Sequence, residues 1–278
     1  MFTEIHPGNY DRVRALFADL TYHIQVPSIL AGNTRGRVLV DDPAEPRMAL
    51  IWDQLAALYI VGRLDNSKVW AAIARWITDE PVAQGQRIGI PSLTVAHHPK
   101  TLADQIRSLL EPYELTPGLR YYHTHSQKPV GRQAVPDGFE LRRIGSELLT
   151  QENRPGQRWL LEWILSFWPT TGDFLEKGLG YVALAETGRI VSLCITVFDA
   201  DQYYELGTAT DEAYRRRGLS SAAAGACVDD CLAQNREPIW HCWADNIASV
   251  RVARKIGFRI ERTYEVLRLA VPRTSQSS

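Results

Sequence analysis

The chain has 278 residues, of which 45% are apolar, enough for a substantial core and for two domains. Its 31 basic and 32 acidic residues nearly cancel, so the overall charge argues against a nucleic-acid or anionic-membrane partner. The N-terminus lacks a long apolar segment, and Asp53 and Gln54 interrupt the most apolar region, 48–62. The sequence therefore predicts a soluble protein without a targeting or membrane segment.

The cysteines give a second indication of compartment. All four lie in the second half, and no two form the Cys-x-x-Cys pair of a structural zinc site. We expect reduced, mostly buried thiols in a cytoplasmic protein.

The N-terminal half has the pattern of a small α+β domain, which we assign to residues 1–135. A helix is predicted at 10–20, strands at 37–42, 46–52 and 56–64, and further helices after Asn66 and Thr101. Segment 126–138 holds two prolines and two glycines with few large apolar residues, so it is the predicted linker.

The second half predicts a mixed α/β domain over 136–272, followed by a flexible tail at 273–278. Strands are expected at 139–144, 181–186, 189–198, 203–210, 238–243 and 264–270, and helices at 156–168, 218–235 and 246–258. The succession of strand, helix and strand from 203 to 243 indicates a βαβ unit with a right-handed crossover.

The segment Tyr214–Ala224, YRRRGLSSAAA, stands where this βαβ unit turns from its first strand into its helix. Free N–H groups at a helix start, the helix dipole and three arginines favour a bound anion. Gly218 permits close approach of the backbone, and Ser220 and Ser221 add hydroxyl donors. The alternative is a surface turn with a solvated basic cluster and an alanine-rich packing face.

This segment resembles the acyl-CoA motif of the GNAT acetyltransferases, Arg/Gln-x-x-Gly-x-Gly/Ala, with Ser220 at its last position. A second motif of that family, N-x-x-(A/S)-x-x-x-x-x-K-x-G-F, is matched by Asn246, Ser249, Lys255, Gly257 and Phe258. The resemblance covers 139–270 and is closest to the branch that includes zwittermicin A resistance proteins.

The resemblance implies a fold in which strands 203–210 and 238–243 part and the pantetheine arm of acetyl-CoA inserts between them. Backbone groups of one strand would bind its amides, and N–H groups at the helix start would bind the pyrophosphate. The implied cofactor-binding residues are Thr208, Ala209, Thr210, Arg215, Arg216, Arg217, Gly218, Leu219, Ser220, Ser221, Asn246 and Ser249.

The resemblance also implies a direct attack of an amine on the thioester, which requires a proton acceptor. Glu205 stands on the cofactor-flanking strand, where the family often places this base; the alternative is a strand-edge glutamate that faces solvent or pairs with an arginine. Many relatives protonate the leaving thiolate with a tyrosine, but this chain has Ala253 there. Tyr203, Tyr204, Tyr264 or water could substitute, or no acid is needed.

Other side chains allow functional interpretations that we weigh against structural ones. His97, His98, His123 and His125 invite a metal hypothesis, but nothing completes a ligand set, so no metal is expected. Trp159, Trp163, Phe167 and Trp168 either line an acceptor pocket or form core, and Cys227, Cys231 and Cys242 are expected to pack rather than react.

Together with the residues discussed above, the resemblance implies a cytoplasmic, acetyl-CoA-dependent N-acetyltransferase that acts on the amine of a small molecule or peptide in a ternary complex. The N-terminal domain could complete the acceptor pocket, mediate homodimerisation or be a degenerate relative of the second. The rival hypothesis is a non-catalytic acyl-CoA-binding module. The sequence disfavours a phosphate-loop nucleotide enzyme, because no Gly-Lys-Ser/Thr follows the loop.

Overall fold

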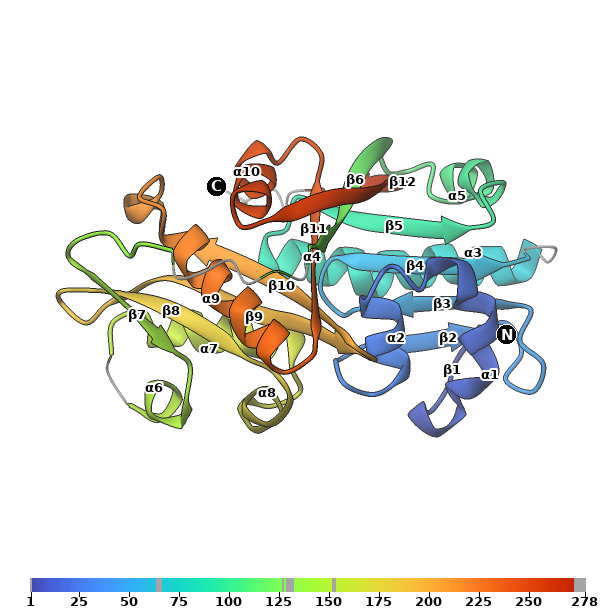
Figure 1. Ribbon diagram of the computed structural model, residues 1–278. Coiled ribbons are helices and arrows are strands. Elements are labelled where there is room, and N and C mark those ends of the chain that lie inside the picture. Colours follow the sequence, from blue (N-terminus) through green and yellow to red (C-terminus); the bar gives the residue numbers. More distant parts are fainter. Residues whose placement is uncertain (1, 64–66, 127, 129–132, 152–153, 273–278) are drawn as a thin grey trace. The chain divides into compact units, whose positions relative to one another are not determined.

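The computed structural model describes residues 2–63, 67–126, 128, 133–151 and 154–272 (Figure 1). It separates into two compact units: unit 1 is built from 1–119 and 265–278, and unit 2 from 120–264. The boundary predicted at 135/136 is therefore not where the units divide. Each unit takes a strand segment from the other half of the sequence, and tail residues 273–278 lie outside the described part of the chain.

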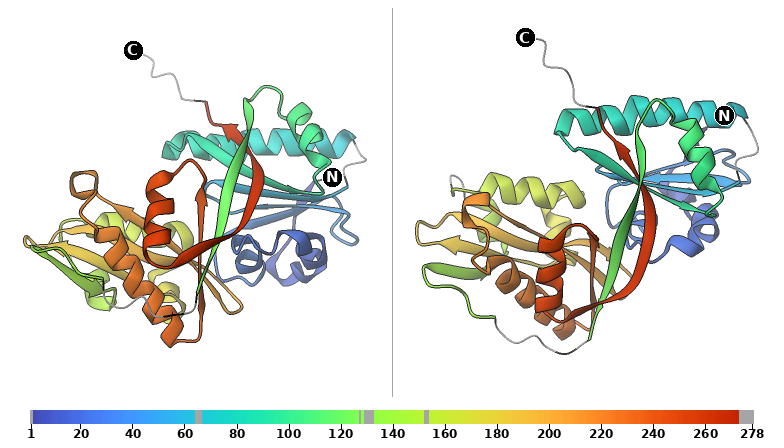
Figure 2. Two further views of the ribbon diagram at one scale, coloured as in Figure 1. Left: turned by 45° about the horizontal axis from the view of Figure 1, so that its top comes forward. Right: turned by 90° about the horizontal axis from the view of Figure 1, so that it is seen from above.

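Unit 1 is a sheet with helices on both faces. Its strands are β1 (Thr3–Glu4), β2 (Arg37–Val40), β3 (Met48–Trp52), β4 (Ala57–Gly62), β5 (Ser92–His98) and the C-terminal part of β12 (Phe258–Ala270). Neighbouring strands are antiparallel except β4 and β5, which are parallel. The helical segments are η1 (Pro7–Asn9), α1 (Asp11–Arg14), η2 (Ala15–Leu20), α2 (Gln25–Leu30), α3 (Ser67–Ile77), η3 (Thr78–Val82), α4 (Ala83–Ile88) and α5 (Leu102–Leu109). In Figure 2, α3 covers one face and α1 and α2 the other.

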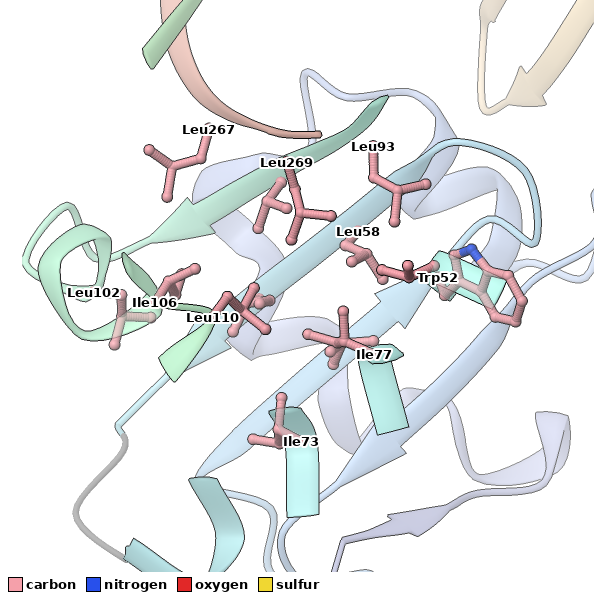
Figure 3. Packing of buried hydrophobic residues seen from close by; sticks show 14 of the residues in the cluster. Trp52, Leu58, Ile73, Ile77, Leu93, Leu102, Ile106, Leu110, Leu267 and Leu269 are labelled. Carbon is pink, nitrogen blue, oxygen red and sulfur yellow. The ribbon is translucent and has the colours of Figure 1, made fainter. Parts of the chain in front are cut away.

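The core of unit 1 shows why β12 belongs to it. Leu267 and Leu269 of β12 are 3% and 0% exposed and lie in one cluster with side chains from β3, β4, β5, α3 and α5 (Figure 3). Leu267 and Leu269 also stand opposite Val95 and Leu93 in the antiparallel register of β12 with β5. The end of the chain thus completes the sheet and core of the N-terminal unit.

Unit 2 is a second sheet with helices on both faces. Its strand order is β12, β6 (Leu115–His125), β11 (Glu237–Trp243), β10 (Tyr203–Thr210), β9 (Ile190–Ala200), β8 (Gly180–Ala185), β7 (Phe139–Arg143), with parts of β6 and β12 contributed here. The helical segments are α6 (Ser146–Thr150), α7 (Gln157–Phe167), α8 (Thr171–Lys177), η4 (Glu212–Tyr214), α9 (Leu219–Ala233) and α10 (Ile247–Lys255). Helices α9 and α10 cover one face, and α7 covers the other (Figure 2).

Each predicted helix or strand corresponds to an element of the structure, but several observed elements were not predicted. The three N-terminal strand predictions coincide with β2, β3 and β4, and the helix predicted at 10–20 is divided into α1 and η2. Strands β1, β5 and β6 and the short helices α2, α4, α6 and α8 were not predicted. Strand β6 contains Pro117 and Gly118 and is rich in polar residues, a composition that disfavours a strand prediction.

The two units share one order of strand pairing. Strands β7 to β11 pair in sequence order, antiparallel up to β9–β10 and parallel at β10–β11, which repeats the pattern of β1 to β5. Each series is then followed by an antiparallel strand from the other half: β12 beside β5, and β6 beside β11. No helix among the described residues is long and apolar enough to cross a bilayer.

Candidate functional site

The site begins where two parallel strands of unit 2 separate. Pairing of β10 with β11 starts at Tyr203 opposite Glu237 and ends at Glu205 opposite Ile239, although both strands continue. The remaining residues of β10 pair only with β9, and those of β11 only with β6. One backbone edge of each strand is therefore open to a ligand. In unit 1, the parallel pair β4–β5 remains joined from Ala57–Thr94 to Val61–His98, so it has no such opening.

The loop after β10 brings a helix N-terminus to this opening. Gly218 is the residue before α9 and has φ +83°, a left-handed conformation that favours glycine. A Cβ built there would meet no atom within 4 Å, so the glycine is required by backbone conformation and not by crowding. Arg216 also has positive φ, +64°, which a non-glycine residue rarely adopts and which bends the loop around the helix start.

The first turn of α9 offers unsatisfied donors. No side chain caps the helix, and the backbone N–H groups of Leu219, Ser220 and Ser221 have no protein acceptor among the described residues. Because α9 has 15 residues, its dipole places a partial positive charge at this end. The local structure is suited to a phosphate group.

A cavity of about 630 Å³ joins these features. It is lined by Thr208, Ala209, Thr210, Tyr214, Arg215, Arg216, Gly218, Leu219, Ser220, Ser221, Asn246, Ala248, Ser249, Arg251 and Val252. The lining includes three arginines and no carboxylate, so the cavity favours a polyanionic ligand. Eleven of the twelve residues implied as cofactor-binding by the sequence are in this lining.

Arg217 is the exception. It is not in the lining, and its guanidinium lies over the rings of Phe139 and Tyr214, at 5.9 and 5.5 Å from their centroids. Four lining residues were not predicted: Tyr214, Ala248, Arg251 and Val252. Three of them follow Asn246 on α10 at helical spacing, so the second motif together with a 3.6-residue period could have indicated them.

The hydroxyls of Thr208, Thr210 and Ser220 in the cavity wall are bound to other protein groups. Thr208 donates to the Leu193 carbonyl at 2.6 Å, and Thr210 and Ser220 are 2.7 Å apart between their hydroxyl oxygens. Their backbone groups, rather than these side chains, are therefore the groups that remain to pair with an extended ligand.

Asn246 and Ser249 begin the second wall of the cavity. The Asn246 side chain accepts from the Ser249 N–H at 3.1 Å and caps α10, and the Ser249 hydroxyl accepts from Trp240 Nε1 at 2.9 Å. At the other end of the helix, a Cβ on Gly257 would lie 2.8 Å from His125 Nε2, so only glycine fits. The second motif thus fixes helix α10 against the sheet.

Glu205 lies where the pairing of β10 and β11 ends, and its side chain is 7% exposed. Its Oε2 is 3.0 Å from Nδ1 of His241 on β11, whose side chain is 2% exposed. The alternative expectations of a solvent-facing glutamate or one paired with arginine are thus wrong. The predicted base is a buried carboxylate beside a histidine.

Three tyrosines were considered as proton donors, and they have different surroundings. Tyr204 donates to the Lys177 carbonyl and packs among α9 residues, so it is a core residue. Tyr264 accepts from Arg120 Nε at 3.2 Å and its ring is 6.0 Å from that of His241. Tyr203 begins the β10–β11 pairing, and Ala253 is fully buried in the core.

The remaining candidates have structural contacts. His123 and His125 bond the carbonyls of Trp240 and Ile256, each at 3.0 Å, and burial lowers the pKa of both rings. Within the described residues, no group of three or more potential ligands could hold a metal. Trp168 is buried and donates to the Thr196 carbonyl, so it belongs to the core.

Cys227, Cys231 and Cys242 are buried and free of disulfides, and burial raises the pKa of each thiol. A thiol that stays protonated is a poor nucleophile, which favours the expected packing role for these cysteines.

Comparisons with known proteins agree with this geometry. The model of the GNAT acetyltransferase family matches residues 14–267. The Bacillus subtilis protein "Uncharacterized N-acetyltransferase YdfB" is 24% identical over 267 residues, 95% of this chain and 97% of the relative. A GCN5-related N-acetyltransferase-like protein from Streptococcus suis has a TM-score of 0.69 at 22% identity, covering 94% of this chain and 98% of that one. A tandem GNAT protein from the clavulanic acid biosynthesis pathway has a TM-score of 0.57 at 12% identity, with 99% of each chain covered.

Proposed function

Because the chain belongs to the GNAT acetyltransferase family and is an acyltransferase, we propose that it transfers the acetyl group of acetyl-CoA to a primary amine in a ternary complex. The acceptor class is the amine of a small molecule or peptide. The observation that carries this proposal is the single cavity that joins the open edge of β10 to the free N–H groups of α9.

The residues of unit 2 fit the two chemically distinct parts of the donor. The pantetheine arm carries amides, and the open backbone of Thr208–Thr210 can pair with them as a neighbouring strand would. The pyrophosphate is an anion, and the α9 N-terminus with Arg215 and Arg216 provides donors and positive charge. Asn246 and Ser249 would act mainly by holding α10 as the opposite wall.

The chemical step needs a proton acceptor, which we assign to Glu205. As the amine nitrogen attacks the thioester carbonyl, a C–N bond forms, and the C–S bond then breaks with its electron pair leaving on sulfur. The proton lost by the amine passes to the Glu205 carboxylate, directly or through water. Ala253 stands at the usual tyrosine position and Tyr204 is bound in the core, so the thiolate either leaves unprotonated or takes its proton from Tyr203, Tyr264 or water.

We propose that unit 1 is a relative of unit 2 that does not bind the donor. Its order of strand pairing supports an architecture shared with unit 2, while its fully joined β4–β5 pair supports the absence of a site for pantetheine.

The amino-acid sequence of residues 236–258 supports ancestry near the zwittermicin A resistance branch. Four free thiols support a cytoplasmic location. A homodimer is also proposed, with unit 1 as its contact surface.

Calorimetric titration with acetyl-CoA tests the donor site. Wild type should bind one equivalent per chain, and Gly218→Glu should abolish binding because its carboxylate stands where the pyrophosphate is expected. Gly89→Glu is the matched control: Gly89 has φ +74° and open space like Gly218, but belongs to unit 1. It should lose similar stability and keep full binding.

Failure of wild type to bind acetyl-CoA or a longer acyl-CoA would refute the proposal, and two equivalents per chain would refute the assignment of unit 1. If binding is intact, an amine panel then separates the enzyme from a non-catalytic acyl-CoA-binding module. The enzyme is expected to release free CoA thiol only with an acceptor amine present.

A further inference from the structure

The buried contact between Glu205 and His241 has a feature that a purely structural contact lacks. Glu205 Oε2 lies 3.0 Å from His241 Nδ1, yet this oxygen has no hydrogen-bond partner among the described residues. The contact therefore has the distance of a hydrogen bond without its angle. A buried carboxylate oxygen without a hydrogen bond is destabilising, and such groups often mark sites that a substrate completes.

The side chain of Glu205 points to the sheet face away from α9. Its neighbours on either side, Tyr204 and Leu206, pack in the core under α9, so Glu205 between them faces the opposite side. Gly207 shares that side: a Cβ built on it would lie 3.5 Å from Trp163 of α7. Glu205 is thus on the α7 face, at the level where β10 and β11 begin to part.

His241 comes to the same face from β11. It stands opposite Tyr122 of β6, and the two rings lie 5.0 Å apart between centroids. Its side chain is 2% exposed although the residue as a whole is partly accessible, so its accessible surface is backbone. The backbone of His241 therefore belongs to the open edge of β11, where acetyl-CoA is proposed to bind, and its buried imidazole contacts Glu205. This one residue links the donor site to the carboxylate.

The groups around the pair make it a defined polar site among aromatic rings. Tyr122 and Tyr264 face His241, and Phe198 stands opposite Glu205 on β9. Burial, with the negative charge of Glu205 among lesser causes, raises the pKa of Tyr122 to about 12, so this phenol is neutral at physiological pH. In such surroundings a carboxylate needs a donor to hold its orientation.

We propose that His241 is the positioning residue of the catalytic base: its Nδ1–H donates to Glu205 Oε2 and holds the carboxylate toward the acceptor amine. This inference rests on the proposed function. A small rotation of the imidazole or of the carboxylate aligns the bond, because the distance is already 3.0 Å. The other carboxylate oxygen is then oriented to accept the proton that the amine loses.

Two substitutions at one position test this role. His241→Asn keeps a side-chain N–H donor near the position of Nδ1, whereas His241→Phe keeps the ring beside Tyr122 and removes the donor. His241→Phe should lower kcat about 10- to 100-fold, the effect of losing a hydrogen bond to a charged group. His241→Asn should retain kcat within a few-fold of wild type. KM and Kd for acetyl-CoA should be unchanged in both variants, since His241 does not line the cavity at the start of α9.

A double-substitution cycle shows whether His241 acts through Glu205. If it does, His241→Phe in a Glu205→Gln background should lower kcat no further. Equal kcat losses in the Asn and Phe variants, or additive losses in the double variant, would overturn the proposal. His98→Gln, at an exposed histidine of unit 1, is the control expected to keep wild-type rates.

Nitrogen-15 NMR of histidine-labelled protein tests the contact without any turnover. The resonance assigned to His241 by comparison with His241→Asn should show a proton on Nδ1 in wild type and its loss in Glu205→Leu. An Nδ1 proton signal that is the same in wild type and Glu205→Leu would overturn the inference. Failure of the proposed function would instead appear as absent acetyl-CoA binding, so the two failures are distinguishable.

Discussion

At the scale of single residues, the buried cysteines predict how stability changes with pH. Burial raises the pKa of Cys227, Cys231 and Cys242 in the folded chain, while in the unfolded chain a thiol ionises near pH 8.5. The stability that these protonated thiols contribute is thus fully present below pH 8.5 and is lost as the pH rises, because only the unfolded chain gains the negative charge of the thiolates. The free energy of unfolding should fall between pH 7 and 9.5, as measured by urea denaturation with reductant present.

Cys231→Ala provides the comparison for that measurement. This substitution removes one thiol whose pKa is raised, so the variant should lose less stability than wild type over the same pH interval. A wild-type stability that is flat or rises with pH would contradict the assignment. Native thiols should also react with iodoacetamide far more slowly than those of the denatured chain.

The sequence indicated which residues lie together where a motif fixed the backbone, and it did so incompletely where the face taken by a side chain mattered. Gly218, Ser220 and Ser221 reach the cavity because a helix must start there. Arg217, one residue before Gly218, instead packs on aromatic rings, one of which belongs to Phe139 on the distant strand β7. The local sequence around Arg217 does not indicate this contact. Which face Glu205 takes, and its contact with His241, depended on a register between strands that no local pattern specifies.

At the scale of elements, helix α10 allows its structural and ligand-binding roles to be separated. Asn246→Ala removes the cap on the Ser249 N–H and should cost about 1 kcal/mol of stability. Asn246→Asp keeps a capping oxygen but places a negative charge in the cavity lining. It should therefore retain stability and weaken acetyl-CoA binding, as measured by thermal unfolding and calorimetry. Loss of stability in Asn246→Asp would show that the cap depends on the amide.

Elements with strong periodicity were predictable, and those defined by their neighbours were not. Helices α3, α5 and α7 have apolar residues at helical spacing, and each lies where that spacing predicted a helix. Strand β6 has polar and aromatic residues because it lies between β11 and β12 inside a sheet, where partners rather than composition determine its pairing. Its omission also explains why the predicted linker was taken as the domain boundary.

At the scale of the whole molecule, the exchange of strand segments predicts how the chain responds to cutting. Fragment 136–278 lacks β6, which pairs with β11 from Arg120–Trp243 to Thr124–Ile239, and fragment 1–135 lacks β12. Each fragment expressed alone should be unfolded or insoluble, as judged by circular dichroism. Cleavage of the folded full-length protein at a protease site engineered between residues 133 and 136 should leave both pieces together in gel filtration. Separation of the pieces without denaturant would contradict the exchanged arrangement.

The pairing of β12 with β5 also determines when the sheet of unit 1 can be completed during synthesis. The ribosome makes β12 long after β5, so the N-terminal sheet emerges with an unpaired edge and an incomplete core. Contacts so distant along the chain form slowly, because a long loop must close before they contribute. During synthesis the exposed β5 edge is a site for association with other chains, and a nascent chain is protected from it only when Leu267 and Leu269 arrive.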